Sequence, residues 1–398
     1  MKDKNRLIPK LRFPEFVKDG EWFEKELNEL GNMINGLTYS PNDIREEGLL
    51  VLRSSNIQNG QIDLSDSVFV KSEIKGANLT EPDDILVCVR NGSKALIGKN
   101  ALISKDIPLA THGAFMTIFR AKHPKFVFQL FQTERYDNQV KADLGATINS
   151  INGKNFLKYK FLVPKTPEQQ KIASFLSNLD ELIQAHKQKL ELLKAHKKGL
   201  MQNLFPQEGE KVPKLRFPEF KDDGEWVEKK LGKIAKVTTG NKDTQNKVDN
   251  GKYPFFVRSQ TVERIDSYSY DGEAILTSGD GVGVGKNFHY IRGKFDFHQR
   301  VYCICDFDKE TCGQFVFMYF SQHFYERVMK MSAKNSVDSV RKVMITEMPI
   351  NMPFKQEQQK IASCLSSLDE LITAQAEKIE QLERHKKGLM QGAFPETF

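Results

Sequence analysis

The sequence predicts a mixed α/β protein of the α+β class, with two globular domains separated by two long antiparallel helices that form a coiled coil. Three observations lead to this prediction. The chain has 398 residues, which is more than one ordinary domain contains. Two segments of the first half return almost unchanged in the second half. The longer of these segments has the heptad pattern of a coiled-coil helix. We therefore expect an internal pseudo-two-fold symmetry.

The shorter recurrent segment opens each half of the chain. Its first copy, PKLRFPEFVKDGEWFEKEL, occupies residues 9–27, and its second copy, PKLRFPEFKDDGEWVEKKL, occupies residues 213–231. The two copies are identical at 15 of 19 positions. Because a duplicated segment indicates a duplicated structural unit, we expect one globular domain over residues 1–165 and a second over residues 206–352.

The longer recurrent segment is expected to form the two helices, over residues 166–205 and 353–398. Its copies, which begin EQQKIAS and end at a Phe-Pro pair, agree at 27 of 39 positions. Apolar side chains recur in both copies at alternating intervals of three and four residues, so the helices should pair along this seam. The seam comprises Ile172, Leu176, Leu179, Ile183, Leu190, Leu193 and Leu200 in the first copy, and Ile361, Leu365, Leu368, Ile372, Ile379, Leu382 and Leu389 in the second.

Polar residues complete the seam at equivalent layers: His186 and Lys197 in the first copy, and Gln375 and Lys386 in the second. We interpret His186 and Gln375 as devices that fix the register of the pair rather than as catalytic groups. A helix of about 34 residues is roughly 50 Å long. Because the repeats run in the same chain order, a two-fold axis requires the helices to lie antiparallel.

The regions between the near-copies, residues 28–150 and 232–340, match only as a faint pattern. Three short correspondences survive: VLRS at residues 51–54 with FVRS at 256–259, IGKN at 97–100 with VGKN at 284–287, and TINSI at 147–151 with SVDSV at 336–340. This contrast indicates one fold that carries two different surfaces. Uneven drift after a recent duplication is the alternative.

The composition is that of a globular protein, with 39% hydrophobic residues and no apolar stretch of the roughly 18 residues that a membrane helix needs. The N-terminal residues lack the apolar core of a signal peptide, so we expect a cytoplasmic protein. The formal charge of +7 would attract a polyanion, although many proteins without a nucleic-acid partner are equally basic. Five cysteines without CxxC spacing indicate reduced thiols and no metal site.

No catalytic motif is found, and we expect no catalytic residue. The loop GDGVGVGK at residues 279–286 lacks the spacing and the Ser or Thr of a Walker A motif, so we interpret it as a turn between strands that approaches a nucleic-acid backbone or makes no such contact. Neither NPPY nor DPPY, which adenine methyltransferases use, occurs. His112 and His298 have no paired nucleophile or carboxylate motif and are interpreted as core or surface histidines. The 28 phenylalanines favour core packing over base stacking.

The layout of two variable domains and two EQQKIA helices resembles the specificity (S) subunit of type I restriction-modification systems, over essentially the whole chain. The motif that carries the resemblance is a proline-containing lead into Glu-Gln-Gln-Lys-Ile, which reads VPKTPEQQKI at residues 163–172 and MPFKQEQQKI at residues 352–361. The second copy has Gln356 where the first has Pro167. This departure affects only the start of the helix.

The resemblance implies that each variable domain is a target-recognition domain that reads one half of a bipartite sequence in double-stranded DNA. It also implies that the helices dock two modification (methyltransferase) subunits and set the spacer between the half-sites. Two restriction (endonuclease/translocase) subunits would complete the complex. The chain itself would then be non-catalytic and hold no cofactor, since S-adenosylmethionine would bind to the modification subunit, and ATP and magnesium to the restriction subunit.

Because recognition domains differ from one another, the candidate DNA contacts are chosen by residue type. Arginine, asparagine and glutamine read guanine and adenine edges through paired hydrogen bonds, whereas lysine more often contacts phosphate. The candidates are Arg53, Ser54, Asn56, Arg90, Ser93, Lys94, Lys99 and Lys154 in the first half, and Arg258, Gln260, Lys286, Asn287, Arg300, Arg341 and Lys342 in the second. For each of them, a solvated side chain without a ligand is the alternative.

Two other functions stay open on the sequence. A nuclease or methyltransferase with a divergent site would show activity as the isolated chain. A coiled-coil scaffold or adaptor would bind no DNA, and a gel-shift of the partner-bound complex would distinguish it.

Overall fold

The computed structural model describes residues 7–144, 149–331 and 339–395, and the chain forms two compact units. The first unit falls within residues 1–187 and 377–398, and the second within residues 188–376. Residues 147–148 and 336–338 of the TINSI and SVDSV correspondence lie outside the described residues. Both units combine strands with helices, which confirms the predicted mixed α/β class.

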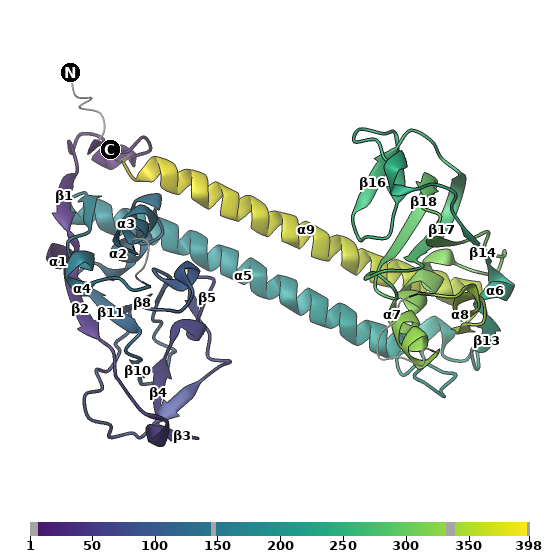
Figure 1. Ribbon diagram of the computed structural model, residues 1–398, viewed down its shortest axis with the longest axis horizontal. Helices are drawn as coiled ribbons and strands as arrows, with labels where there is room; N and C mark the ends of the chain where they lie inside the picture. Colours follow the sequence, from purple (N-terminus) through teal and green to yellow (C-terminus); the bar gives the residue numbers. More distant parts are fainter. Residues whose placement is uncertain (1–6, 145–148, 332–338, 396–398) are drawn as a thin grey trace. The chain divides into compact units, whose positions relative to one another are not determined.

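Two helices of 39 residues each, α5 (Thr166–Leu204) and α9 (Lys355–Ala393), are shared between the units (Figure 1). Leu, Lys, Glu, Gln and Ala, which are strong helix formers, make up most of both segments. The boundary between the units falls after residue 187 in α5 and after residue 376 in α9. Each unit therefore contains the beginning of one long helix and the end of the other.

The first unit is built around two small sheets. Its other elements are β1 (Phe23–Glu26), α1 (Leu27–Leu30), β2 (Gly31–Asn35), β3 (Ile44–Arg45), β4 (Leu49–Leu52), β5 (Ile57–Gln58), β6 (Gln61–Ile62), β7 (Val68–Val70), β8 (Ile85–Cys88), β9 (Asn100–Leu102), β10 (Ala110–His112), β11 (Met116–Ala121), α2 (Pro124–Leu130), α3 (Glu134–Leu144), α4 (Gly153–Phe156) and β12 (Lys160–Val163). One sheet has the strand order β2-β11-β8-β9 and the other β10-β4-β7-β3, while β1 pairs with β12 and β5 with β6. Strands β4 and β8 are buried along their whole length, as their continuous apolar sequences LLVL and ILVC would suggest.

The second unit is built around one larger sheet. Its other elements are β13 (Val227–Lys230), α6 (Leu231–Ile234), β14 (Lys236–Thr239), β15 (Tyr253–Phe256), β16 (Val262–Ile265), β17 (Tyr270–Ser278), β18 (Phe288–Phe297), β19 (Val301–Cys305), α7 (Gly313–Met331), α8 (Lys342–Thr346) and β20 (Pro349–Met352). Its six-stranded sheet has the order β14-β19-β17-β18-β15-β16, and β13 pairs with β20.

The two units share one strand frame. The order β2-β11-β8-β9 of the first corresponds to β14-β19-β17-β18 of the second, and the antiparallel pair β1 and β12 corresponds to β13 and β20. Each unit also has one parallel strand pair: β10 and β4 in the separate sheet of the first unit, with Ala110 opposite Leu50, and β15 and β18 in the second, with Phe255 opposite Asp296. The faintly similar regions thus share a central strand order, whereas their remaining strands differ in number and pairing.

The Phe-Pro pairs that follow the long helices contribute to the cores. In the first unit the ring of Phe394, which follows α9, lies edge-on to Trp22 at 6.1 Å between centroids. In the second unit Phe205, which follows α5, lies edge-on to Trp226 at 6.3 Å. Aromatic rings fill the rest of both cores, so the phenylalanines do serve mainly as core residues: the largest fully buried side chains include Phe119, Phe126, Phe131, Phe156 and Phe161 in the first unit and Phe255, Phe295, Phe315 and Phe320 in the second.

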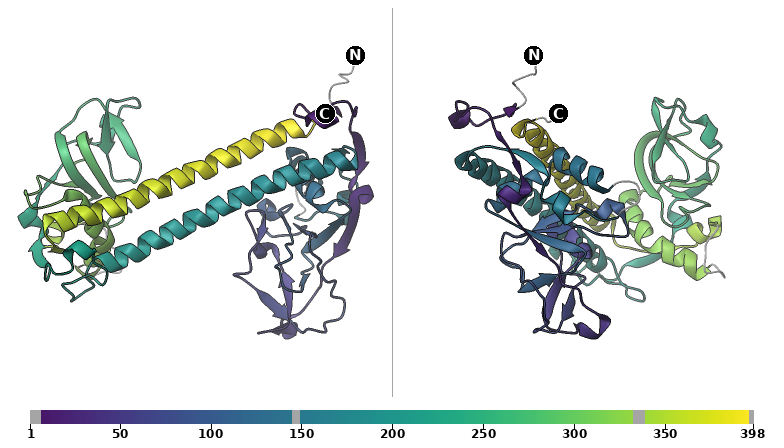
Figure 2. Two further views of the ribbon diagram at one scale, coloured as in Figure 1. Left: turned by 180° about the vertical axis from the view of Figure 1, so that it is seen from behind. Right: turned by 60° about the vertical axis from the view of Figure 1, so that its left-hand side comes forward.

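Within the first unit the two long helices run antiparallel, because Asp180 pairs with Lys386 at 2.5 Å and Lys187 with Glu383 at 2.6 Å. The N-terminal segment lies beside the end of α9, where the N–H of Leu11 donates a 2.8 Å hydrogen bond to a carbonyl of the helix (Figure 2). In the second unit Lys197 of α5 pairs with Asp369 of α9 at 2.5 Å.

Every residue predicted for the helix seam is buried or partly buried. By contrast, three leucines that the heptad pattern leaves out of the seam are exposed: Leu182, Leu192 and Leu371. The first seam residues of each helix, Ile172 and Leu176 in α5 and Ile361 and Leu365 in α9, pack into the cores of their units. The seam therefore begins as part of a globular core and continues along the helix.

Candidate nucleic-acid interface

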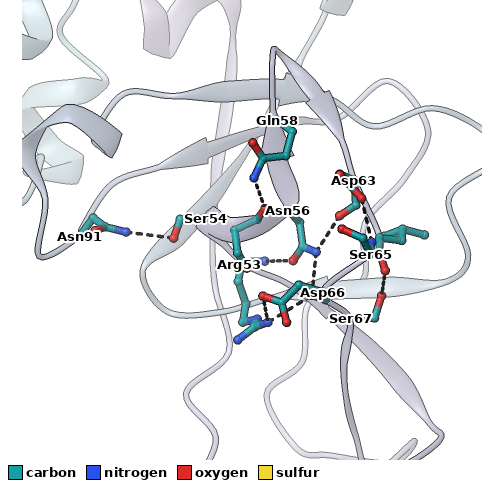
Figure 3. Close-up of polar contacts among 11 residues, drawn as sticks. Arg53, Ser54, Asn56, Gln58, Asp63, Ser65, Asp66, Ser67 and Asn91 are labelled. Atoms are coloured by element: carbon teal, nitrogen blue, oxygen red, sulfur yellow. Dashed lines mark hydrogen bonds and ion pairs between the residues drawn. The ribbon is translucent and has the colours of Figure 1, made fainter. Parts of the chain in front are cut away.

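Two candidates of the first unit follow the buried strand β4, and one follows the buried strand β8. Arg53 and Ser54 stand at the start of the 3-10 turn Ser54–Asn56, and Arg90 lies two residues beyond β8. The side-chain amide of Asn91 donates a 2.9 Å hydrogen bond to the Ser54 hydroxyl, which joins the two strand ends (Figure 3). Polar side chains from two distant sequence segments thus meet at one place.

Asn56 is fully buried and holds the loop after β4 together. Its side-chain carbonyl accepts a 2.8 Å hydrogen bond from the N–H of Arg53, and its amide donates to the backbone carbonyls of Asp63 at 2.8 Å and Asp66 at 3.1 Å (Figure 3). An asparagine that has no exposed surface and whose amide is bound to backbone carbonyls does not reach a base edge. The prediction of Asn56 as a DNA contact is therefore wrong, and its role is to shape the backbone at Arg53.

Arg53 and Arg90 both keep part of their side chains in solvent. The Nη2 atom of Arg53 lies 2.8 Å from the Oδ2 atom of Asp66, and the Arg53 side chain is 32% exposed. Arg90 is exposed, and its guanidinium lies 5.8 Å from the ring centroid of Phe115, which is also exposed. Because exposed ion pairs and cation–π contacts are weak, either arginine would exchange its contact for DNA at little cost.

The remaining candidates of the first unit lie around Arg90. Ser93 and Lys94 are exposed in the turn that follows it, and Lys99 is exposed at the end of the same loop. Lys154 is exposed in α4, shortly after the segment that forms a bridge with Arg90. These candidates thus come from the loop that follows β8 and from the segment bridged to it, and all of them are exposed.

In the second unit, Arg258 follows β15 and Arg300 precedes β19, and one carboxylate binds both. The Oδ1 atom of Asp280 accepts a 3.0 Å hydrogen bond from the Nη1 of Arg258, and its Oδ2 accepts one of 2.5 Å from the Nη1 of Arg300. Partial burial alone would raise the pKa of Asp280, but the hydrogen bonds from Arg300 and Arg258 outweigh it and hold this pKa below its ordinary value. The carboxylate therefore stays charged between the two guanidinium groups.

The loop between β17 and β18 is tied to the same cluster by Asn287. Its side-chain amide donates to the backbone carbonyl of Arg258 at 3.1 Å and to the Ser278 hydroxyl at 3.3 Å. Lys286 is exposed, with its ammonium group 5.6 Å from the ring centroid of Tyr325. Asn287 thus positions the loop, whereas Lys286 lies at the surface.

Three further candidates of the second unit are exposed at its loops and helix starts. Gln260 lies in the turn after β15, Arg341 caps helix α8, and Lys342 is the first residue of that helix. The N–H of Val340 donates a 2.7 Å hydrogen bond to the carbonyl of Gly279, which places the start of α8 beside the Asp280 loop. Arg341 and Lys342 therefore stand next to the cluster around Asp280.

The two histidines are buried and bind backbone groups. The Nε2 atom of His112 lies 3.0 Å from the carbonyl oxygen of Ile34, and the Nδ1 atom of His298 accepts a 2.9 Å hydrogen bond from the N–H of Arg300. Burial lowers the pKa of both imidazoles, so both are neutral at pH 7. The interpretation of these residues as structural histidines agrees with this geometry.

Sequence reasoning missed Asp280 and Asn91. Asp280 belongs to the loop at residues 279–286, for which only a turn is expected, and Asn91 is not among the candidates. A usable signal was their position, since each comes within three residues after a buried apolar strand, where polar side chains gather at the strand end. Residue type alone gave no reason to expect a carboxylate between two arginines.

Two features are absent from the described residues. No cluster of three or more His, Cys, Asp and Glu side chains suited to a metal ion is found among them. No helix in this part of the chain has the length and apolar character to cross a membrane. The five cysteines are free thiols, three of them buried.

The two units thus have one central strand order and carry polar side chains at the same strand ends. The sequence model of one family, the type I restriction modification DNA specificity domain, matches residues 19–195 and 223–384, and the chain belongs to this family.

Relatives of known function are similar over different shares of the chain. The specificity subunit of the type I restriction enzyme StySPI from Salmonella potsdam is 29% identical over 180 residues, which are 43% of this chain and only 38% of that subunit. The specificity subunit of the type I restriction enzyme MjaVIII from Methanocaldococcus jannaschii is 26% identical over 356 residues, which are 81% of each chain. Among solved structures, the type I restriction-modification S subunit from M. genitalium matches with a TM-score of 0.69 at 17% identity, over 98% of this chain and 100% of that one, which shows a common fold.

Proposed function

We propose that this chain is the DNA-reading subunit of a type I restriction-modification complex, in which each unit reads one half of a bipartite target. The observation that carries the proposal is that one strand frame occurs twice with different polar side chains at the same strand end. Arg90 forms a bridge with Ser150 in the first unit, where Asp280 forms the equivalent bridge with Ser339 in the second. Recognition of two unrelated half-sites needs one strand order that carries different side chains at its strand ends.

The near-identical helices are the second part of the proposal. The interhelical ion pairs, together with the burial of the predicted seam, support an antiparallel coiled coil related by a pseudo-two-fold axis. Such a pair presents two equivalent surfaces, so it would dock two copies of one modification subunit. Its length would set the spacing of the two recognition domains and therefore of the half-sites.

The chemistry belongs to the partners in this proposal. The modification subunits would bind S-adenosylmethionine and methylate the target, and two restriction subunits would use ATP and magnesium to translocate and cleave DNA that lacks the mark. The chain itself would be non-catalytic and would act in the cytoplasm, where its DNA target lies. Membership in the specificity family and the specificity subunits among its relatives support this assignment.

Methylome sequencing of a host that expresses the chain with its modification subunit tests the recognition function. The expected result is one bipartite methylated motif. Replacing residues 28–150 by the variable region of another such subunit should change one half of the motif and leave the other half and the spacer unchanged. A simultaneous change of both halves would contradict the assignment of one reader to each unit.

Helix length provides a separate test of the spacing role. Inserting one heptad into each long helix, after residue 187 in α5 and after residue 376 in α9, adds about 10 Å at 1.5 Å per residue. At 3.4 Å per base pair, the spacer should lengthen by about three base pairs with unchanged half-sites. An unchanged spacer in a complex that still methylates would show that the helices do not set the spacing.

A further inference from the structure

The backbone of the two units places Arg90 and Asp280 at equivalent positions. Ser150 and Ser339, aligned in the TINSI and SVDSV correspondence, form isolated antiparallel bridges with Arg90 and Asp280 respectively. The hydrogen bonds beside these bridges match as well. The N–H of Ile151 donates to the carbonyl of Val89 at 2.8 Å, and the N–H of Val340 donates to the carbonyl of Gly279 at 2.7 Å. One backbone site therefore carries an arginine in one unit and an aspartate in the other.

A second equivalent position carries arginine in both units. Arg53 and Arg258 are aligned in the VLRS and FVRS correspondence, and each comes just beyond its strand, β4 or β15. In the first unit Arg53 and Arg90 have separate partners, an ion pair with Asp66 for the former and the Phe115 ring for the latter. In the second unit Asp280 instead binds Arg258 and brings a new arginine, Arg300, to the site.

In the second unit, one partly buried carboxylate binds two exposed arginines. The Asp280 side chain is 19% exposed, whereas those of Arg258 and Arg300 are 42% and 61% exposed. Each guanidinium uses its Nη1 atom for the carboxylate, and a guanidinium has five N–H donors in all. The two arginines thus share one carboxylate, and each is exposed and has N–H donors that this carboxylate does not use, as bidentate binding of guanine O6 and N7 requires.

The net charge of the cluster favours a base edge over phosphate as its ligand. Two guanidinium groups with one carboxylate carry a net charge of +1, so Asp280 cancels half of the attraction that two free arginines would exert on phosphate. A carboxylate in this position is useful where direction matters more than charge, because one hydrogen bond to each guanidinium group limits where that group can lie. Base reading depends on that direction, whereas backbone attraction depends mainly on charge.

An exposed aliphatic side chain lies two residues from Asp280. Val282 is 99% exposed at the tip of the loop between β17 and β18, between Gly281, whose φ of 80° lies in the left-handed region, and Gly283. Asn287 ties the end of this loop to the backbone of Arg258. A valine held entirely in water gains nothing from folding, but it fits apolar contact with a thymine methyl group in the major groove.

From these relationships we infer that Arg258 and Arg300, held by Asp280 and flanked by Val282, form the base-reading centre of the second unit, which selects guanine in its half-site. Arg53 and Arg90 form the corresponding centre of the first unit. Asp280 is a positioning residue, because it acts through the two arginines. The inference rests on the proposed DNA-reading function and adds to it the residues and the base that they recognise.

The test uses the complete chain expressed with its modification subunit and methylome sequencing as the readout. Arg258→Lys or Arg300→Lys keeps the charge but removes paired donation, so discrimination at guanine positions of one half-site should fall about tenfold or more. Asp280→Asn should relax the same positions while the other half-site and the spacer stay unchanged. Arg53→Lys or Arg90→Lys should relax the opposite half-site. Arg292→Lys is the matched control, because Arg292 is 75% exposed in the same unit and should leave the motif unchanged.

The outcomes separate this inference from the proposed function. If the wild-type complex methylates no bipartite motif, the proposed function fails and the inference fails with it. If the wild-type complex methylates such a motif but Arg258→Lys and Arg300→Lys leave its bases unchanged, only the inference is overturned. A uniform loss of methylation at all sites, with unchanged base preference, would identify the arginines as phosphate contacts and would also overturn it. Methylation at the unchanged half-site motif shows that the variant chain has folded and assembled.

Discussion

The guanidinium of Arg12 binds the carboxylate of Glu168 through two parallel hydrogen bonds, Nε to Oε1 at 2.8 Å and Nη2 to Oε2 at 2.7 Å. Arg216 and Glu357 repeat this pair in the second unit with the same two distances. The arginine comes from the short recurrent segment and the glutamate from the start of the long one. In both units, each segment therefore satisfies a buried charge of the other.

Removal of either arginine should destabilise its own unit. The side chains of Arg12 and Glu168 are 6% and 1% exposed, so Arg12→Met would leave a carboxylate buried without its partner. Loss of one member of a buried pair costs about 3–5 kcal/mol. Calorimetry should show a lower melting temperature for the first unit, and Arg216→Met should do the same for the second. Equal melting of wild type and variants would show that the pair contributes little to stability.

Charges placed in the helix seam should disrupt the helix pair. Leu179 and Leu368 are partly buried seam residues, so their joint replacement by Asp should cost several kcal/mol wherever the carboxylates are buried and unpaired. Thermal unfolding should begin at a lower temperature, and native mass spectrometry should show loss of the assembly with two modification subunits. A stable and fully active one-to-one complex of the wild-type chain would contradict the two-surface model.

Exposed leucines of the same helices provide the matched control. Leu192 of α5 is 70% exposed and Leu371 of α9 is 54% exposed. Leu192→Asp with Leu371→Asp introduces the same charges without burying them, so the melting temperature should stay close to that of the wild type. An equal loss of stability in both double variants would show that the heptad seam does not mark the contact between the helices.

Acidification below pH 6.5 should destabilise the protein. Burial lowers the pKa of His112, His289, His298 and His323 below the ordinary value of 6.5. Between the ordinary pKa of 6.5 and the lower pKa in the folded protein, the unfolded chain binds more protons than the folded chain. The free energy of unfolding therefore falls as the pH decreases through that window. Melting curves between pH 7.5 and 5.5 should shift to lower temperature.

One variant identifies the contribution of a single imidazole to this pH dependence. His298→Asn retains an acceptor for the N–H of Arg300 but has no proton to bind in this range. Its second unit should therefore lose less stability on acidification than that of the wild type. Hydrogen bonds from Ser40 lower the pKa of the Asp43 carboxyl to about 2, so this group titrates far below the window. Melting that is independent of pH from 7.5 to 5.5 would contradict the prediction.

The helices and the repeated frame were predictable because their signals are local or repetitive. The heptad spacing of Leu179 and Leu368 marks one face of a helix whatever its surroundings, and no seam residue is exposed in the structure. The recurrent segments likewise indicate two similar domains, whatever the order of the strands. Periodicity could not supply the partners of individual polar side chains, because those depend on which loops meet.

The candidate site shows where sequence reasoning stops. Asn56 has the residue type of a base reader, but the carbonyls of Asp63 and Asp66 close around its amide, and only the folded loop puts them there. Asp280 lies 22 residues from Arg258 and 20 from Arg300, so no local pattern could join the three side chains.

The sequence by itself determined the duplication, the two long helices and the face along which they are apolar, since these follow from residue spacing along the chain. The tertiary structure decided which polar side chains are buried and which reach solvent. It did so through strand pairing, which brought the ends of β15, β17 and β19 together and placed Asp280 between Arg258 and Arg300. Such contacts depend on the distance between side chains in space, and the separation of the residues along the chain does not reveal that distance.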